Sequence, residues 1–66
     1  MKVYINGKEK EIKADSSVEE IITVEGFRPE RIVVTINDKV IEKKDYCKKK
    51  LNCRDKLDVF SFVGGG

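Results

Sequence analysis

The 66-residue sequence contains no histidine, no tryptophan, one proline and two cysteines. Histidine is the side chain that most often serves as a general acid or base near neutral pH, so its absence argues against catalysis by this chain. Two cysteines without histidine fall short of the four ligands of a structural zinc site, and we expect no bound metal. Cys47 and Cys53 are also too few for the disulfide framework of a secreted miniprotein. We interpret them as reduced thiols, and a redox or sulfur-handling role stays open.

Long apolar runs and a strong charge of one sign are also absent. No stretch approaches the roughly 20 apolar residues of a membrane span, and the opening MKVYING lacks the apolar core of a secretory signal, so we expect a cytoplasmic protein. The 14 Lys+Arg and 12 Asp+Glu are interspersed, which is typical of a solvated surface rather than of a nucleic-acid interface. A small nucleic-acid binder would need five lysines to converge, namely Lys43, Lys44, Lys48, Lys49 and Lys50.

The first half of the sequence predicts a hairpin followed by a helix. Residues 2–6 (KVYIN) alternate between two faces, and Asn6-Gly7 is a strong signal for a tight type I′ turn, so we expect a return strand at 8–13. The stretch SSVEEII has the spacing of a capping box, with Ser16 or Ser17 three residues before Glu19 or Glu20. A short helix is therefore expected over residues 17–25, closed by a glycine at position 26.

The second half predicts three more strands. β-Branched residues dominate RIVVTI at 31–36, which favours a central strand with both faces apolar. A turn at Asn37-Asp38 leads into a short strand at 39–41, and LDVFSFV at 57–63 is the last strand. The lysine-rich stretch 42–54 is expected to be irregular or to hold one helical turn, pinned by Tyr46 and Leu51.

This order of elements predicts an α+β fold in which one face of a single sheet packs on one helix. The whole chain, residues 1–66, is expected to form one domain with a flexible tail at 64–66. The expected core consists of Val3, Ile5, Ile12, Val18, Ile21, Ile22, Ile32, Val34, Ile36, Leu51, Leu57 and Val59.

The last strand predicts a candidate docking surface. If Leu57 and Val59 face the helix, Phe60 and Phe62 lie on the open face of the sheet, because side chains alternate along a strand. Tyr4 or Val33 could cover these rings. The alternative, which we favour, is a partner-docking surface, since aromatic residues are enriched in interface cores.

The terminal Gly64, Gly65 and Gly66 predict a thin tail that can thread into a narrow channel of a partner protein. Glycine has large backbone freedom and no side chain, and the α-carboxylate of Gly66 is ionised at neutral pH because such groups titrate near ~3.5. A carboxylate is a poor acylating agent and needs activation, usually by ATP. The sequence has no Walker motif and no G-x-G-x-x-G, so we expect a carried substrate rather than an enzyme, with no cofactor bound.

The combination of VYING, SSVEEII, RIVVTINDKVI and DKLDVFSFVGGG resembles the ThiS family of ubiquitin-like β-grasp sulfur carriers over the whole chain. The resemblance implies a β-grasp fold with a mixed sheet of four to five strands on one helix. It implies that an E1-like, ThiF-type enzyme uses ATP to adenylate Gly66. The product is then converted to a thiocarboxylate, with sulfur supplied through a cysteine desulfurase, and a ThiG-type thiazole synthase receives the sulfur in thiamine biosynthesis. Gly65 and Gly66 match the family's di-glycine, Gly64 its frequent third small residue, and Phe60, Phe62 and Val63 the partner-facing strand.

Two departures and two rivals accompany this resemblance. The turn before the last strand usually reads Gly-Asp in the family, but here it is Arg54-Asp55, and Cys47 and Cys53 belong to no family motif. The small subunit of molybdopterin synthase has the same fold and tail chemistry, although such chains tend to be longer. A β-grasp interaction module without acyl chemistry is the other alternative.

Overall fold

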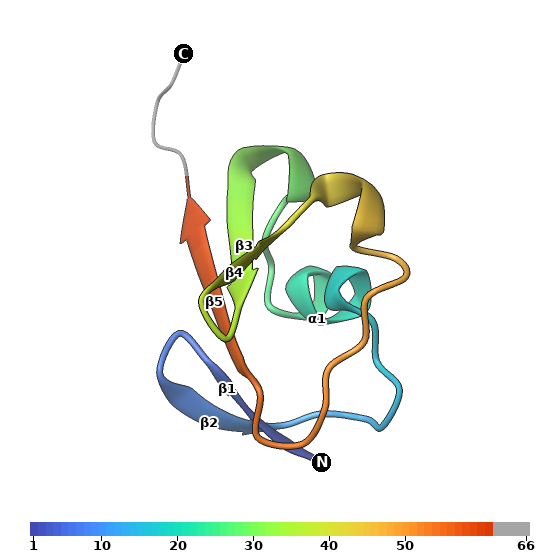
Figure 1. Cartoon of the computed structure of the whole chain (residues 1–66), viewed down its shortest axis with the longest axis vertical. Coiled ribbons are helices and arrows are strands. Elements are labelled where there is room, and N and C mark those ends of the chain that lie inside the picture. Colours follow the sequence, from blue (N-terminus) through green and yellow to red (C-terminus); the bar gives the residue numbers. More distant parts are fainter. Residues whose placement is uncertain (62–66) are drawn as a thin grey trace.

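The computed structural model describes residues 1–61, which form one five-stranded sheet with a single α-helix against one face (Figure 1). The strands lie in the order β2-β1-β5-β3-β4, and only the β1–β5 pair is parallel. The elements are β1 (Lys2–Ile5), β2 (Lys8–Glu11), α1 (Val18–Val24), the 3₁₀ turn η1 (Pro29–Arg31), β3 (Ile32–Ile36), β4 (Lys39–Ile41), the 3₁₀ turn η2 (Lys43–Asp45) and β5 (Lys56–Ser61). The predicted α+β, β-grasp arrangement is confirmed.

The first hairpin forms around the predicted Asn-Gly turn. Asn6 and Gly7 both have positive φ, 51° and 83°, as a type I′ turn requires. The return strand β2 ends at Glu11 rather than at residue 13, because the chain turns away there: the Lys13 carbonyl accepts the Ser16 N–H at 3.2 Å. The hairpin is therefore two residues shorter on its second strand than predicted.

Helix α1 begins with the predicted capping box. Ser17 is the N-cap: its hydroxyl accepts the Glu20 N–H at 3.2 Å, and the Glu20 carboxylate accepts the Ser17 N–H at 2.9 Å. The hydrogen bonds to Ser17 hold the pKa of Glu20 below its ordinary value. The N–H groups of Val18 and Glu19 donate to the carbonyls of residues 49 and 46, so the lysine-rich loop caps the first turn.

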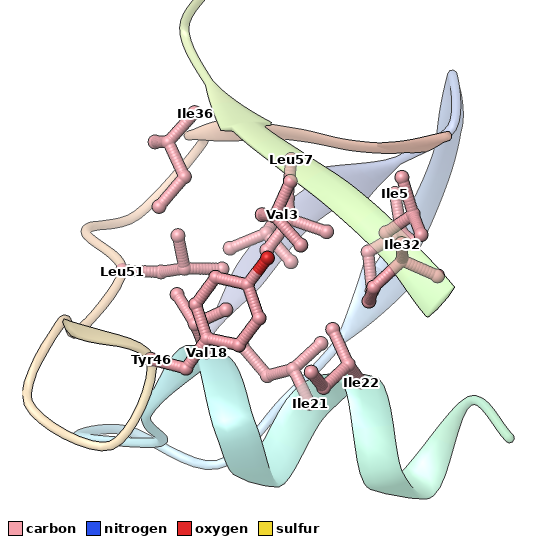
Figure 2. Packing of buried hydrophobic residues seen from close by; sticks show 12 residues of the cluster. Val3, Ile5, Val18, Ile21, Ile22, Ile32, Ile36, Tyr46, Leu51 and Leu57 are labelled. Carbon is pink, nitrogen blue, oxygen red and sulfur yellow. The ribbon is translucent and has the colours of Figure 1, made fainter. Parts of the chain in front are cut away.

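Buried apolar residues from the sheet, α1 and the loop form one core (Figure 2). Eleven of the twelve predicted core residues are buried, whereas Ile12 is only partly buried because β2 has already ended. Tyr46, predicted only to pin the loop, is a full core member at 3% exposure. Its hydroxyl points toward the sheet in Figure 2, and burial raises the pKa of Tyr46, partly opposed by a hydrogen bond from the backbone of Val34.

The predicted loop and strands of the second half are confirmed with small shifts. β3 is interior as expected, paired with β4 on one side and with β5 on the other, although β5 holds the middle position of the sheet. The stretch 42–54 contains the single turn η2 and is anchored by Tyr46 and Leu51. β5 begins one residue earlier than predicted, and the rest of the predicted strand, Phe62 and Val63, lies outside the described residues.

A polar network holds the turn that precedes β5. The Asp55 carboxylate accepts the Asn52 N–H at 2.7 Å and the Asn37 side-chain amide at 3.0 Å, and the Asn37 side-chain oxygen accepts the Lys56 N–H at 3.0 Å. Arg54 in this turn has φ 69°, a left-handed conformation that disfavours residues with a Cβ. The side chain of Arg54 is exposed, so we find no packing that offsets this strain.

We expect Arg54→Gly to stabilise the protein by about 1 kcal/mol, because glycine adopts positive φ without a Cβ penalty. The free energy of unfolding is measured by urea titration. Arg54→Ala is the matched control: it removes the same charge but keeps a Cβ, and should bring no gain. If the two variants are equally stable, the positive φ of Arg54 does not strain the turn.

Candidate functional site

The candidate site lies where β5 ends. This strand runs parallel to β1 and ends at Ser61, far from the N-terminus (Figure 1). Ser61 lies opposite Ile32, the first residue of β3. The predicted sulfur-carrying Gly66, the threading residues Gly64 and Gly65, and the docking residues Phe62 and Val63 all lie outside the described residues. The described structure therefore fixes the position of Ser61, the residue that precedes this segment.

Phe60 is on the open face of the sheet, as predicted, and its side chain is 57% exposed. Its register partner is Val33, which is half-buried, so Val33 flanks the ring without covering it. Tyr4 instead lies opposite Lys56, four positions before Phe60 along β5, a distance of about 13 Å in a strand. Of the two residues predicted to cover Phe60, Val33 only flanks the ring, and Tyr4 lies elsewhere on the same face of the sheet.

An apolar surface follows from this register, and we call it the open-face patch: Val33, Val40 and Phe60. Val40 is 67% exposed and lies opposite Thr35, which is opposite Asp58 on β5. Asp58 and Phe60 share a face because side chains alternate along the strand, so all three apolar residues are on the face away from α1. The half-buried Asp58 gives the patch one acidic neighbour.

An asparagine side chain extends the sheet at the same end. β1 ends at Ile5, but Asn6 continues the pairing: its N–H donates to the Leu57 carbonyl at 2.9 Å, and its side-chain oxygen accepts the Val59 N–H at 2.8 Å. Asn6 thus makes two hydrogen bonds to β5, one through its main chain and one through its side chain. This fixes the half of β5 that carries Phe60.

The other sequence candidates are dispersed. Cys47 and Cys53 are free, exposed thiols in the loop between β4 and β5. Lys44 pairs with Glu42 at 3.3 Å, so an acidic side chain lies among the lysines on which a nucleic-acid site would depend. Within residues 1–61, no cluster of acidic and cysteine side chains is arranged to hold a metal ion. No helix in the described part of the chain is long and apolar enough to cross a membrane, and the cytoplasmic location stays a prediction.

Comparison with known proteins assigns the chain to a family. The sequence matches the ThiS family over residues 3–66. The chain belongs to the ThiS family. A crystal structure of the thiamine biosynthesis protein ThiS from Geobacter metallireducens superposes with a TM-score of 0.84 and 23% identity, covering 100% of both chains. At this identity the likeness shows the fold, and it agrees with the β-grasp arrangement above.

Longer relatives contain a segment similar to this ThiS-family chain. A thiazole synthase of Paramagnetospirillum magneticum is 33% identical over 66 residues, which is 100% of this chain and 20% of that protein. A thiazole synthase of Magnetococcus marinus is 32% identical over 66 residues, with the same coverage. The chain therefore spans about one fifth of the length of these curated relatives.

Sequence reasoning missed the side-chain roles of Asn6, Asn37 and Asp55. Residue type alone predicts that each of them lies in a turn, and the structure confirms these turns. The hydrogen bond between the Asn6 side chain and Val59 spans 53 positions along the chain, and local sequence gives no signal for such a contact. The Asn-Gly turn motif by itself explains why asparagine stands at position 6, so it gives no hint of the contact with β5.

We expect Asn6→Gly to loosen β5 beside the site. Glycine keeps the positive φ of the turn but removes the oxygen that accepts the Val59 N–H, at a cost of about 1 kcal/mol. Hydrogen exchange of the Val59 amide should become faster. Asn6→Asp, which keeps an acceptor and tolerates the same φ, is the control and should leave exchange near the original rate. Unchanged Val59 exchange in Asn6→Gly would show that the side-chain bond is not important for the strand.

Proposed function

We propose that this chain is a sulfur carrier in the biosynthesis of the thiazole ring of thiamine, with the sulfur held as a thiocarboxylate on Gly66. The observation that carries the proposal is the family match, which runs through Gly66. The relatives named thiazole synthase, which contain a segment similar to the full chain, support thiamine as the pathway.

The proposed chemistry takes place on the main chain. A carboxylate oxygen of Gly66 attacks the α-phosphorus of ATP and pyrophosphate leaves, which gives an acyl adenylate. Sulfide then attacks the acyl carbon and displaces AMP, which leaves the thiocarboxylate; a persulfide donor gives an acyl disulfide instead, and a thiol must reduce its S–S bond to release the thiocarboxylate. The chain contains no histidine to act as a general base, so we assign catalysis to a ThiF-type adenylating enzyme that uses ATP, with sulfur supplied through a cysteine desulfurase.

A ThiG-type thiazole synthase is the proposed acceptor of the sulfur. A domain that is part of an enzyme's own chain often works together with the rest of that enzyme. The 20% share of the two thiazole synthases fits this relation. The same observation favours thiamine over the molybdopterin pathway, and a non-carrier interaction module has no comparable support.

The open-face patch is the proposed docking surface for these enzymes. Val40 and Phe60 are exposed by 67% and 57%, and Phe60 lies one residue before the last described residue of β5. A partner that binds the patch therefore holds the chain close to the start of the segment that carries Gly64, Gly65 and Gly66. Phe62 and Val63, in the same segment, complete the proposed contact.

Intact-mass spectrometry tests the carrier function directly. Incubation of the protein with ATP, a ThiF-type enzyme and a sulfur source should raise its mass by the difference between one sulfur and one oxygen atom. A chain that ends at Val63, without the three glycines, is the control and should show no such product. If an enzyme proven active on another carrier leaves the mass unchanged, the proposal is wrong.

We expect Phe60→Ser to weaken docking without unfolding the protein. Because the ring is 57% exposed, stability should change little, whereas loss of a central aromatic anchor costs over about 1 kcal/mol in binding, or several-fold in kcat/KM. The measurement is adenylation of the carrier by pyrophosphate exchange. Val24→Ser, which alters an apolar residue exposed by 82% on α1, is the control and should adenylate normally. Equal rates in both variants would contradict docking through the patch.

A further inference from the structure

The outer edge of β2 presents unpaired backbone groups to solvent. β2 is an edge strand, and all four of its side chains are exposed. Met1 and Ile12 bond each other: the Ile12 N–H donates to the Met1 carbonyl at 2.8 Å, and the N-terminal ammonium donates to the Ile12 carbonyl at 2.6 Å. Since hydrogen-bonded pairs alternate in an antiparallel ladder, Lys8 and Lys10 bond to β1. The N–H and C=O groups of Glu9 and Glu11 therefore point outward.

A groove runs along the helix side of this edge. It has a volume of about 270 Å³ and lies between the end of β2 and α1. Its apolar lining comes from Ile12, Ile21 and Val24, and Val24 is 82% exposed. Lys10 and Glu25 join the two walls through a salt bridge of 3.2 Å. Apolar side chains of an added strand would have a place to pack beside the free backbone groups.

The charges of β2 are divided between its faces. Lys8 and Lys10 lie opposite Ile5 and Val3, on the helix side, whereas Glu9 and Glu11 lie on the open side. If two copies pair their β2 strands antiparallel in one continuous sheet, the helix-side residues of both copies lie on the same face of that sheet. Lysine would then oppose lysine and glutamate oppose glutamate in every register, which is destabilising. Antiparallel pairing of this edge with a second copy is therefore disfavoured, whereas a strand with basic residues on the open side complements Glu9 and Glu11.

We propose that the β2 edge binds an extended segment of a partner protein in which apolar residues alternate with Lys or Arg. The segment adds a sixth strand by bonding to the backbone of Glu9 and Glu11. Its apolar side chains enter the groove against Ile21 and Val24. Its basic side chains lie beside the carboxylate of Glu9 and that of Glu11, which also pairs with the N-terminal ammonium at 3.0 Å. This surface is separate from the open-face patch and does not depend on the sulfur chemistry.

Synthetic peptides titrated into the isotope-labelled full chain test this proposal by NMR. The probe is a blocked seven-residue peptide that alternates Val or Leu with Lys, and the comparison peptide carries Glu in place of each Lys. At saturation the Lys peptide should slow hydrogen exchange of the Glu9 and Glu11 amides by at least about tenfold and leave Lys8 and Lys10 unchanged. Its affinity should exceed that of the Glu peptide and fall with added salt.

Three variants separate this surface from the rest of the molecule. Val24→Asp should weaken binding of the Lys peptide, and Glu9→Lys should reduce or reverse the preference for it. Phe60→Ser should bind it as the original protein does. Absence of binding at millimolar peptide, equal affinity for both peptides, or protection at the open-face patch instead of at Glu9 and Glu11 would each overturn the proposal.

Discussion

The fold depends on the insertion of the C-terminal strand between the two hairpins. β1 and β2 form one antiparallel pair and β3 and β4 another, and β5 is the strand that bonds to both. Leu57 on β5 is fully buried, directly opposite Ile5 on one side and Ile36 on the other. A chain of 66 residues can bury only a small core. Its N-terminal and C-terminal halves are therefore held together by the same strand that leads to the glycines.

This insertion gives β5 two kinds of residue in alternation. Leu57 and Val59 complete the core beneath α1, and Asp58 and Phe60 lie on the open face. The bond from Val59 to the Asn6 side chain holds the strand where β1 no longer extends beside it. The backbone of Phe60 is therefore positioned by core packing on the opposite face. In the proposed docking role, Phe60 needs no packing of its own on the open side.

Much of this could be predicted because the signals were local. The Asn6-Gly7 turn, the Ser17–Glu20 capping box and the alternation along β5 each depend on residues within a few positions of one another. The burial of Tyr46 could not be predicted in the same way, since it depends on the loop returning over the N-terminus of α1. Likewise, the early end of β2 is decided by the Lys13–Ser16 bond rather than by composition. The sequence correctly predicts that Phe60 lies on the open face. Its exposure depends on the register of β5 against β3, which no local pattern contains.

A sheet covered on one face only leaves its open face and its edge strands exposed, and the open face and the β2 edge differ in how they are protected from indiscriminate association. The β2 edge carries one sign of charge on each face, and this opposes antiparallel self-pairing while leaving the backbone available to a complementary strand. On the open face, among residues 1–61, Phe60 and Val40 are exposed, and the acidic neighbour of the patch is the half-buried Asp58. Contiguous apolar patches on a protein surface commonly mark interaction sites. The docking proposed above accounts for the position of this patch beside the end of β5.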